Sequence, residues 1–267
     1  MCVDQAINNF EAISLEAMEG VKLMNRTDRK YWFSVDLLAS LLAEVSDQYY
    51  LMEIKGERNM AYSTIYYDTP ENQMYNNHHR GKLNRYKIRR RSYVSSQTSF
   101  LEIKFKSNKG RTMKVRRVCD YHNEGFGEQE ATFIAAKSPY QCDMLRRALV
   151  TKFNRLMLVS KAMNERCTID SSLQFCGNEN SVSLDALVIV EVKSDGKSYS
   201  PIIEALNRRR LKPSGFSKYC IGRSITDPTL RHNRFKVKHR ELEKRVEIIN
   251  LKENKNGVDR EFRVSGY

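Results

Sequence analysis

Residues 184–194, LDALVIVEVKS, form the stretch of sequence that decides the fold. Successive side chains of a β-strand point to opposite faces of its sheet, so this stretch has one apolar face and one face that ends in charge. The first face carries Val188, Val190 and Val192, and the second carries Leu187, Ile189, Glu191 and Lys193. A strand that is apolar on both faces over most of its length is covered by helices, so we expect its charged end to point into the molecule.

Three more segments, around residues 84–94, 99–107 and 111–119, carry cations at alternate positions and are expected to be strands. Their charged faces hold Arg85, Lys87, Arg89 and Arg91, then Glu102, Lys104 and Lys106, then Lys114 and Arg116. The opposite faces hold Leu101, Ile103, Phe105 and Val115. One such stripe is typical of a solvated strand face, but four strands with the same pattern favour an interior lined by cations.

The remaining elements follow from hydrophobic spacing and turn residues. Further strands are expected at 22–33, 49–54, 63–68, 155–163, 165–170 and 182–193, and helices at 34–45, 127–136, 140–152, 200–210 and 216–225. About eight strands with inserted helices predict an α+β fold, a closed antiparallel β-barrel tunnel with a cationic interior, wrapped by helices. Residues 1–225 would form a single domain, and residues 226–267 a charged tail that is helical or frayed.

The 267 residues include 46 Lys and Arg against 32 Asp and Glu, a formal net charge of +14. This excess suits polyanionic partners, namely nucleic acid, an acidic membrane surface or phosphates. Cations enclosed inside the molecule need counter-anions there, because two like charges about 4 Å apart repel by about 4 kcal/mol at an effective dielectric of about 20. This requirement favours phosphates among the three kinds of partner. A linear polyphosphate supplies evenly spaced counter-charge, and arginine can bind each phosphate through two N–H groups.

The six cysteines include no C-x-x-C pair and lack the spacing of a disulfide scaffold or a zinc site, which favours reduced thiols in the cytoplasm. No stretch approaches the roughly 20 apolar residues that span a bilayer. We therefore expect a cytoplasmic protein that has no membrane segment of its own but can still dock on a membrane-protein partner. The neighbouring His78 and His79 are interpreted as surface residues rather than metal ligands.

Seven short segments occur in a fixed order along the chain. They are RTDRKYWF (26–33), STIYYDT (63–69), RRRSY (89–93), LEIKFK (101–106), MKVRR (113–117), VIVEVKS (188–194) and GFSKYCIG (215–222). Together they resemble the catalytic domain of the vacuolar transporter chaperone (VTC) polyphosphate polymerases and its bacterial relatives, in the triphosphate tunnel metalloenzyme superfamily. The resemblance covers roughly residues 20–225.

The resemblance implies transfer of the γ-phosphate of ATP to a growing inorganic polyphosphate chain, with Mn²⁺ or Mg²⁺ as cofactor. It implies a metal-binding and catalytic Glu191, a catalytic Lys218, and Ser217 closing with Lys218 over the terminal phosphates. The full phosphate-binding set is Arg26, Lys30, Arg89, Arg91, Lys104, Lys106, Lys114, Lys161, Lys193, Ser217 and Lys218. A phosphate terminus is already an anionic nucleophile, so the reaction requires no side-chain base.

Some interpretations stay open at this point. Relatives carry a Tyr-x-Arg triplet in the strand after the central helices, whereas Val159, Ser160 and Lys161 stand there, so Lys161 is expected to replace the arginine. Glu102 is interpreted as the acidic partner of Lys104, with a second metal ligand as the alternative. For Glu191, the alternative to metal binding is an ion pair with a cation such as Lys193.

Two other functions are compatible with the same residues. One is hydrolysis of triphosphate or polyphosphate, and the other is non-catalytic sensing of polyphosphate or inositol phosphates. Nucleic acid is the least favoured partner, because the sequence contains no recognised nucleic-acid-binding module.

Overall fold

A computed structural model describes residues 2–19, 27–246 and 248–251 of the chain. Its centre is one 12-stranded sheet, in which every strand pair is antiparallel except the pair β1 and β3. The strands are β1 (Glu11–Ile13), β2 (Thr27–Ser34), β3 (Tyr49–Met52), β4 (Met60–Asp68), β5 (Arg85–Tyr93), β6 (Thr98–Lys106), β7 (Thr112–Cys119), β8 (Arg146–Ser160), β9 (Glu165–Cys176), β10 (Ser181–Leu184), β11 (Leu187–Ser194) and β12 (Ile249–Leu251). The expected α+β class with an antiparallel sheet is confirmed.

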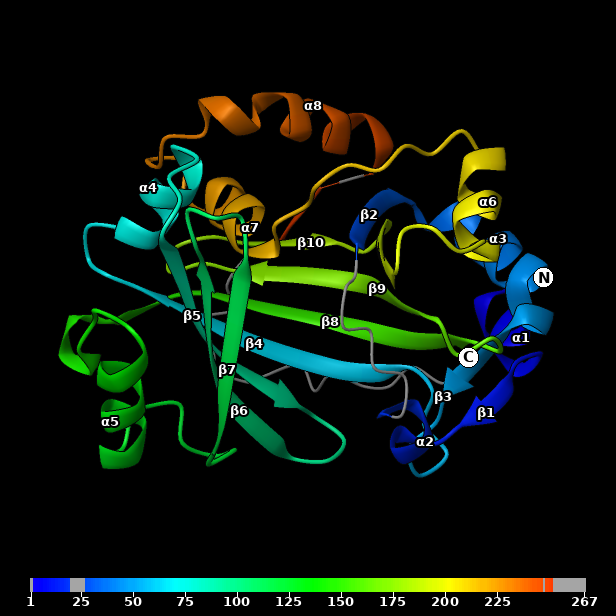
Figure 1. Cartoon of the computed structure of the whole chain (residues 1–267). Coiled ribbons are helices and arrows are strands. Elements are labelled where there is room, and N and C mark those ends of the chain that lie inside the picture. Colours follow the sequence, from blue (N-terminus) through cyan, green and yellow to red (C-terminus); the bar gives the residue numbers. More distant parts are fainter. Residues whose placement is uncertain (1, 20–26, 247, 252–267) are drawn as a thin grey trace.

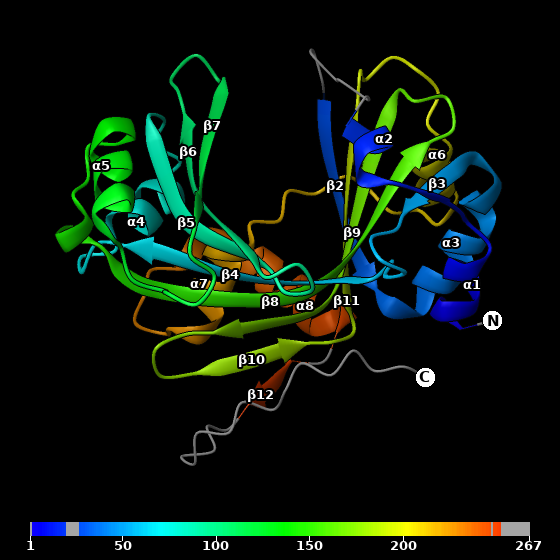
Figure 2. The same cartoon turned by 90° about the horizontal axis from the view of Figure 1, so that it is seen from below.

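The sheet is open, so the predicted closed barrel is wrong. Its main path runs β2, β11, β9, β8, β4, β5, β6, β7, with β10 and β12 continuing from β9, and β3 and β1 from β8. Figure 2 shows this path bent into a U, with β5, β6 and β7 in one wall, β2, β9 and β11 in the other, and β4 and β8 across the base. We call the concave side of this sheet the trough. Within the described residues β2 and β7 do not pair, and the lysines that both walls direct into the trough oppose their approach.

The sheet contains 12 strands among the described residues, instead of the expected eight. The prediction of a helix at residues 140–152 is also wrong, because strand β8 begins at Arg146. A single turn of 3-10 helix (Cys142–Met144) is followed directly by β8, which pairs with β4 on one side and β9 on the other. Ala148, Leu149 and Val150 are all buried because both faces of β8 are covered here. An apolar run buried on both faces has no alternation, so its spacing does not distinguish strand from helix.

Helices cover the convex side of the sheet, as the apolar valine face predicted. The helices of the chain are α1 (Val3–Asn8), α2 (Leu15–Glu19), α3 (Leu38–Val45), α4 (Gln73–His79), α5 (Glu128–Lys137), α6 (Pro201–Arg208), α7 (Lys218–Thr226) and α8 (Lys236–Arg245). Residues of α1, α3 and α6 pack in one buried cluster with Val188, Val190 and Val192, each of which has no exposed surface. On the other half of the sheet, Ile134 of α5 packs with Ile88, Leu101 and Ile103. The valines are therefore core residues, and the charged faces are left for the trough.

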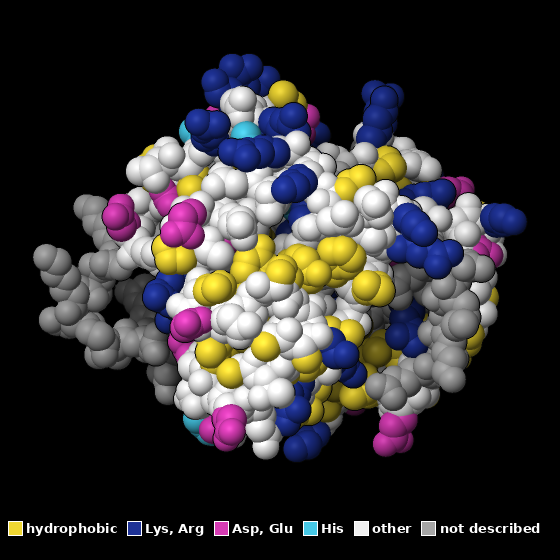
Figure 3. All heavy atoms as spheres, turned by 60° about the vertical axis from the view of Figure 1, so that its left-hand side comes forward, with side chains coloured by type: hydrophobic (Ala, Val, Ile, Leu, Met, Phe, Trp, Pro, Cys, Tyr) yellow, Lys and Arg dark blue, Asp and Glu magenta, His cyan; other side chains and the backbone are white. Residues whose placement is uncertain are grey.

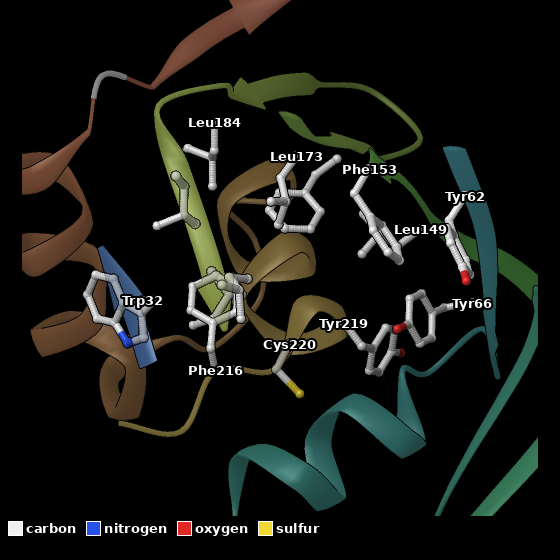
Figure 4. Packing of buried hydrophobic residues seen from close by; sticks show 14 of the residues in the cluster. Trp32, Tyr62, Tyr66, Leu149, Phe153, Leu173, Leu184, Phe216, Tyr219 and Cys220 are labelled. Atoms are coloured by element: carbon white, nitrogen blue, oxygen red, sulfur yellow. The ribbon is translucent and has the colours of Figure 1, made fainter. Parts of the chain in front are cut away.

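Helices α7 and α8 lie on the opposite, concave side and fill one part of it (Figure 1). Figure 4 shows the cluster beneath α7, in which Phe216 and Tyr219 meet aromatic and aliphatic residues of the sheet. The helix approaches closely at Gly222, where an added Cβ would lie 2.6 Å from Leu149 and 2.7 Å from Phe175. Because α7 begins at Lys218, this packing determines where that lysine enters the trough.

The segment after residue 225 contains the helix that was expected in the tail. In α8, Leu242 is fully buried, and Val246 just after the helix belongs to the same cluster as Trp32 and Phe216. Figure 3 shows Lys and Arg side chains gathered at the top of the molecule, where α8 lies in Figure 1. The division of the chain at residue 225 stays a prediction. Among the described helices, none has the length and apolar character needed to cross a membrane.

Candidate functional site

A carboxylate held between two lysines occupies the wall formed by β2 and β11. Lys30 lies directly opposite Glu191 in the antiparallel register, and its Nζ is 3.1 Å from Glu191 Oε1. The Nζ of Lys193 is 3.1 Å from the other carboxylate oxygen. Burial alone would raise the pKa of Glu191, but Lys193 and Lys30 outweigh it and hold this pKa well below its usual range. Glu191 is therefore ionised, and both of its oxygens have cationic partners.

A second carboxylate, Glu102, is held in the same way in the opposite wall. Its side chain is 2% exposed and is 2.7 Å from Arg89, and it also forms an ion pair with Lys114. Burial opposes ionisation, but Arg89, Arg91 and Lys114 together lower the pKa of Glu102 to about 2. The expected pairing of Glu102 with Lys104 is wrong, because Lys104 faces Lys87 across β5 and β6 while Glu102 faces Arg89.

The base of the trough holds a third carboxylate that the sequence reasoning missed. Arg155 of β8 donates two hydrogen bonds to Asp170 of β9, at 2.5 and 2.8 Å, and Lys218 at the start of α7 also pairs with Asp170. The Asp170 side chain is 4% exposed. Burial would raise the pKa of Asp170, but Arg155 and Lys218 hold it well below its usual range. A buried carboxylate thus joins the sheet to α7.

Several cations of the trough have no carboxylate within ion-pair distance in the described part of the chain, and Lys87, Arg91 and Lys104 are among them. Lys87 instead donates to the hydroxyl of Ser217 at 3.0 Å, and burial lowers the pKa of both Lys87 and Arg91. Desolvation between the walls lowers the pKa of Lys104, and the positive charges of Lys87 and Lys30 lower this pKa further. The Lys104 side chain still keeps an exposed surface that a ligand can reach. These positions favour the arrival of an anion.

Aromatic rings of the base lie beneath the cations. The Arg89 guanidinium lies 5.9 Å from the ring centre of Tyr66, and those of Arg91 and Arg155 lie 5.9 and 5.1 Å from Tyr62. Cations are attracted to the faces of aromatic rings when water is excluded. The rings therefore support the cations from below.

Most of the phosphate-binding residues predicted from the sequence meet in the trough, but some do not. Lys30, Arg89, Arg91, Lys104, Lys114, Lys193, Ser217 and Lys218 belong to the groups described above. Lys161 follows the end of β8 and pairs with Glu11 of β1, so the structure does not bring it to this set. Lys106 lies at the end of β6 opposite Arg85, and Arg26 lies outside the described residues.

Arg155, and not Lys161, lies beside Asp170 at the base of the trough. The triplet Phe153, Asn154 and Arg155 is an aromatic-x-Arg sequence within β8, and Phe153 lies under Lys218 with its ring centre 4.5 Å from Nζ. The strand expected from the sequence begins at residue 155, so it does not include the whole of this triplet, which starts six residues before Val159. Correct placement of β8 would have revealed this triplet.

The interpretation of the two histidines as surface residues is also wrong. His79 is 8% exposed and packs against Tyr75 and Phe235. Burial lowers the pKa of His78 to about 2, and the nearby Lys87 and Arg85 contribute in the same direction. His78 therefore stays neutral beside the cationic trough.

The carboxylates offer limited ligands for a metal ion. Among the described residues no three His, Cys, Asp or Glu side chains come together as a metal site. Mg²⁺ is commonly bound by one or two carboxylates together with substrate phosphates and water, and Glu191 suits this pattern because it is ionised and partly exposed. Asp170 and Glu102 do not suit it, because they are almost fully buried among arginine and lysine side chains.

We expect the protein to lose stability as the pH falls from 7 toward 3. Groups whose folded pKa lies below the unfolded value stabilise the folded state above the unfolded pKa, and this stabilisation is lost as the pH falls through the folded pKa. Glu102, Asp170, Glu191 and His78 all shift in this direction, and Glu165, whose pKa burial raises, opposes them. Glu102, Asp170 and Glu191 lose their stabilisation only below about pH 5, so His78→Gln should reduce the slope of the unfolding free energy against pH between pH 7 and 5 by about 1 kcal/mol per pH unit, as measured by urea unfolding. An unchanged slope would contradict this account.

Comparisons with known proteins agree with the resemblance seen in the sequence. Residues 25–226 match the family model described as the VTC domain. No curated protein sequence matches the chain significantly. Solved structures with a similar course of chain include candidate adenylate cyclases from Bacillus halodurans (12% identity, 73% of this chain and 96% of that chain, TM-score 0.44) and Vibrio parahaemolyticus (10%, 74% and 99%, 0.45). Another is a candidate adenylyl cyclase from Hippeastrum with a dominant triphosphatase activity (12%, 76% and 97%, 0.45).

Proposed function

Because the chain belongs to the VTC domain family, we propose that it is a polyphosphate polymerase that transfers the γ-phosphate of ATP to the end of a polyphosphate chain. The observation that carries the proposal is the excess of cations in the trough, where Lys87, Arg91 and Lys104 have no carboxylate partner among the described residues. A chain of phosphates supplies a continuous run of negative charge, and arginine can bind phosphate oxygens through two N–H groups. ATP and polyphosphate are accordingly the proposed partners.

In this reaction the protein mainly positions the two phosphates and neutralises their negative charge. An oxygen of the terminal phosphate forms a bond to the γ-phosphorus of ATP, the bond from that phosphorus to the β,γ-bridging oxygen breaks, and ADP leaves with the electron pair. In the proposed site Arg89, Arg91 and Lys104 bind phosphate oxygens from one wall, and Lys30 from the other. Arg155 and Lys218 would bind the phosphates at the base of the trough. Each then neutralises charge that develops during the transfer.

The proposed metal ion is Mn²⁺ or Mg²⁺, held by Glu191 together with phosphate oxygens. When bound, it would offset the negative charge of the reacting phosphates. Lys30 and Lys193 lie on the two oxygens of Glu191, so at least one of them would turn from the carboxylate to phosphate as the metal binds. After this exchange Glu191 would be paired with the metal ion, and the displaced lysine with a phosphate oxygen.

The polymerase proposal is tested by incubating the purified protein with ATP and Mn²⁺ and separating the products on a polyphosphate-staining gel. We expect long polymer from the wild type and at least about a 100-fold lower rate from Glu191→Gln and from Lys218→Ala. Glu124→Gln and Lys137→Ala change exposed residues outside the trough in the same chemical way and should leave the rate unchanged. Free phosphate without polymer would instead identify a hydrolase, and tight binding of triphosphate without turnover would identify a sensor.

A further inference from the structure

One buried carboxylate joins three elements next to the trough. Asp68, the last residue of β4, is 1% exposed. It accepts hydrogen bonds from the backbone N–H groups of Met74 at 2.8 Å and Tyr75 at 2.9 Å, at the start of α4. It also accepts a hydrogen bond from the hydroxyl of Tyr219, in the first turn of α7. Asp68 therefore fixes the start of α7 relative to the strand that forms the base of the trough.

Tyr219 is surrounded by the groups that face the proposed ligand. It directly follows Lys218, and its ring stacks on that of Tyr66 with 5.1 Å between ring centres (Figure 4). The hydroxyl of Tyr66 accepts a hydrogen bond from Arg89 at 3.3 Å, and Lys87 lies 5.9 Å from the centre of the Tyr219 ring. Burial and the charge of Asp68 raise the pKa of Tyr219, so the hydroxyl keeps its proton and remains a donor to the carboxylate.

Two other contacts hold the same end of α7, and both involve cations that the ligand would compete for. Lys218 is paired with Asp170, and Lys87 donates to Ser217, which caps the helix by accepting from the N–H of Cys220. When phosphates bind, Lys218 and Lys87 turn wholly or partly to phosphate oxygens. The hydrogen bond from Tyr219 to Asp68 involves no such cation, so the ligand does not compete for it.

We propose that Asp68, through the hydroxyl of Tyr219, is a positioning residue that holds Lys218 and Ser217 at the proper place over the terminal phosphates. The inference rests on the proposed function, in which Lys218 binds phosphate. It assigns a role to the tyrosine of the FSKY sequence and to an aspartate that never touches the ligand.

The test compares Tyr219→Phe with Tyr75→Phe by titration calorimetry with inorganic tripolyphosphate. Both tyrosines are almost fully buried, but the Tyr75 hydroxyl donates to the backbone carbonyl of Arg231 instead of a carboxylate. Loss of a hydrogen bond to a charged group should weaken tripolyphosphate binding about tenfold in Tyr219→Phe, and Tyr75→Phe should bind as the wild type does. Thermal melts of each variant monitor the fold.

A double-mutant comparison distinguishes positioning from a general loosening of α7. If Tyr219 acts through Lys218, then Tyr219→Phe should have no further effect on binding in a Lys218→Ala protein. Equal losses in both backgrounds, or wild-type binding by Tyr219→Phe, would overturn the positioning role while the proposed function stands. Failure of the wild type to bind tripolyphosphate would overturn both.

Discussion

Replacing Arg155 with alanine is expected to lower kcat/KM for polymer synthesis by about 100-fold or more, while Lys161→Ala retains the wild-type rate. Arg155 lies at the base of the trough on Asp170, whereas Lys161 lies just after the end of β8 and pairs with the exposed Glu11. Removing a preorganised donor from a phosphate-transfer site commonly costs two to three orders of magnitude, roughly 100- to 1,000-fold. The measurement is the initial rate of polymer formation from ATP for both variants.

The Arg155 variant also changes the charge balance around Asp170. With arginine gone, Lys218 is the remaining partner of a carboxylate that is 4% exposed, and breaking a buried pair costs about 3 kcal/mol. Arg155→Lys restores the charge without the planar fork, so it should recover stability more fully than activity. Wild-type activity in Arg155→Ala together with loss of activity in Lys161→Ala would show that the lysine, and not the arginine, serves the site.

The alternation rule explains why much of the trough could be predicted from sequence. In the run RRRSY, Arg89 and Arg91 face the trough, whereas Arg90 is 2% exposed on the other face and donates to the backbone carbonyls of Asp120 and Gly125. Side-chain direction along a strand depends only on sequence parity, so cations at alternate positions could be assigned to one face correctly.

The partners of those cations could not be predicted in the same way. The pairing of Arg155 with Asp170 depends on the register between β8 and β9, which shifts at an irregularity between Lys152 and Asn154. The helical spacing of Leu145 and Leu149 concealed the first part of β8, so the aromatic-x-Arg triplet was sought at the wrong place. Closure of the sheet into a barrel likewise depends on whether the edge strands β2 and β7 pair with each other. The residue pattern within a single strand does not predict such a pairing.

Replacing Glu102 with glutamine is expected to destabilise the ligand-free protein by about 3 kcal/mol and yet to strengthen its binding of tripolyphosphate. The carboxylate is 2% exposed and is the counter-charge for Arg89 and Lys114, so its neutralisation leaves these cations to repel each other and Arg91. A bound phosphate supplies the missing negative charge and no longer competes with the carboxylate for the same N–H groups. The loss of stability should therefore largely disappear at saturating tripolyphosphate.

Urea unfolding with and without tripolyphosphate measures the first effect, and titration calorimetry measures the second. Glu124→Gln is the matched control, because Glu124 forms an ion pair with Arg147 in which both side chains are more than half exposed, and such pairs contribute about 0 to 1 kcal/mol. The Glu102→Gln variant also decides whether Glu102 is a counter-charge for the neighbouring cations or a metal ligand. A counter-charge predicts unchanged affinity for Mn²⁺, whereas weaker Mn²⁺ binding together with weaker tripolyphosphate binding would make Glu102 a metal ligand. The burial of Glu102 between an arginine and a lysine favours the first outcome.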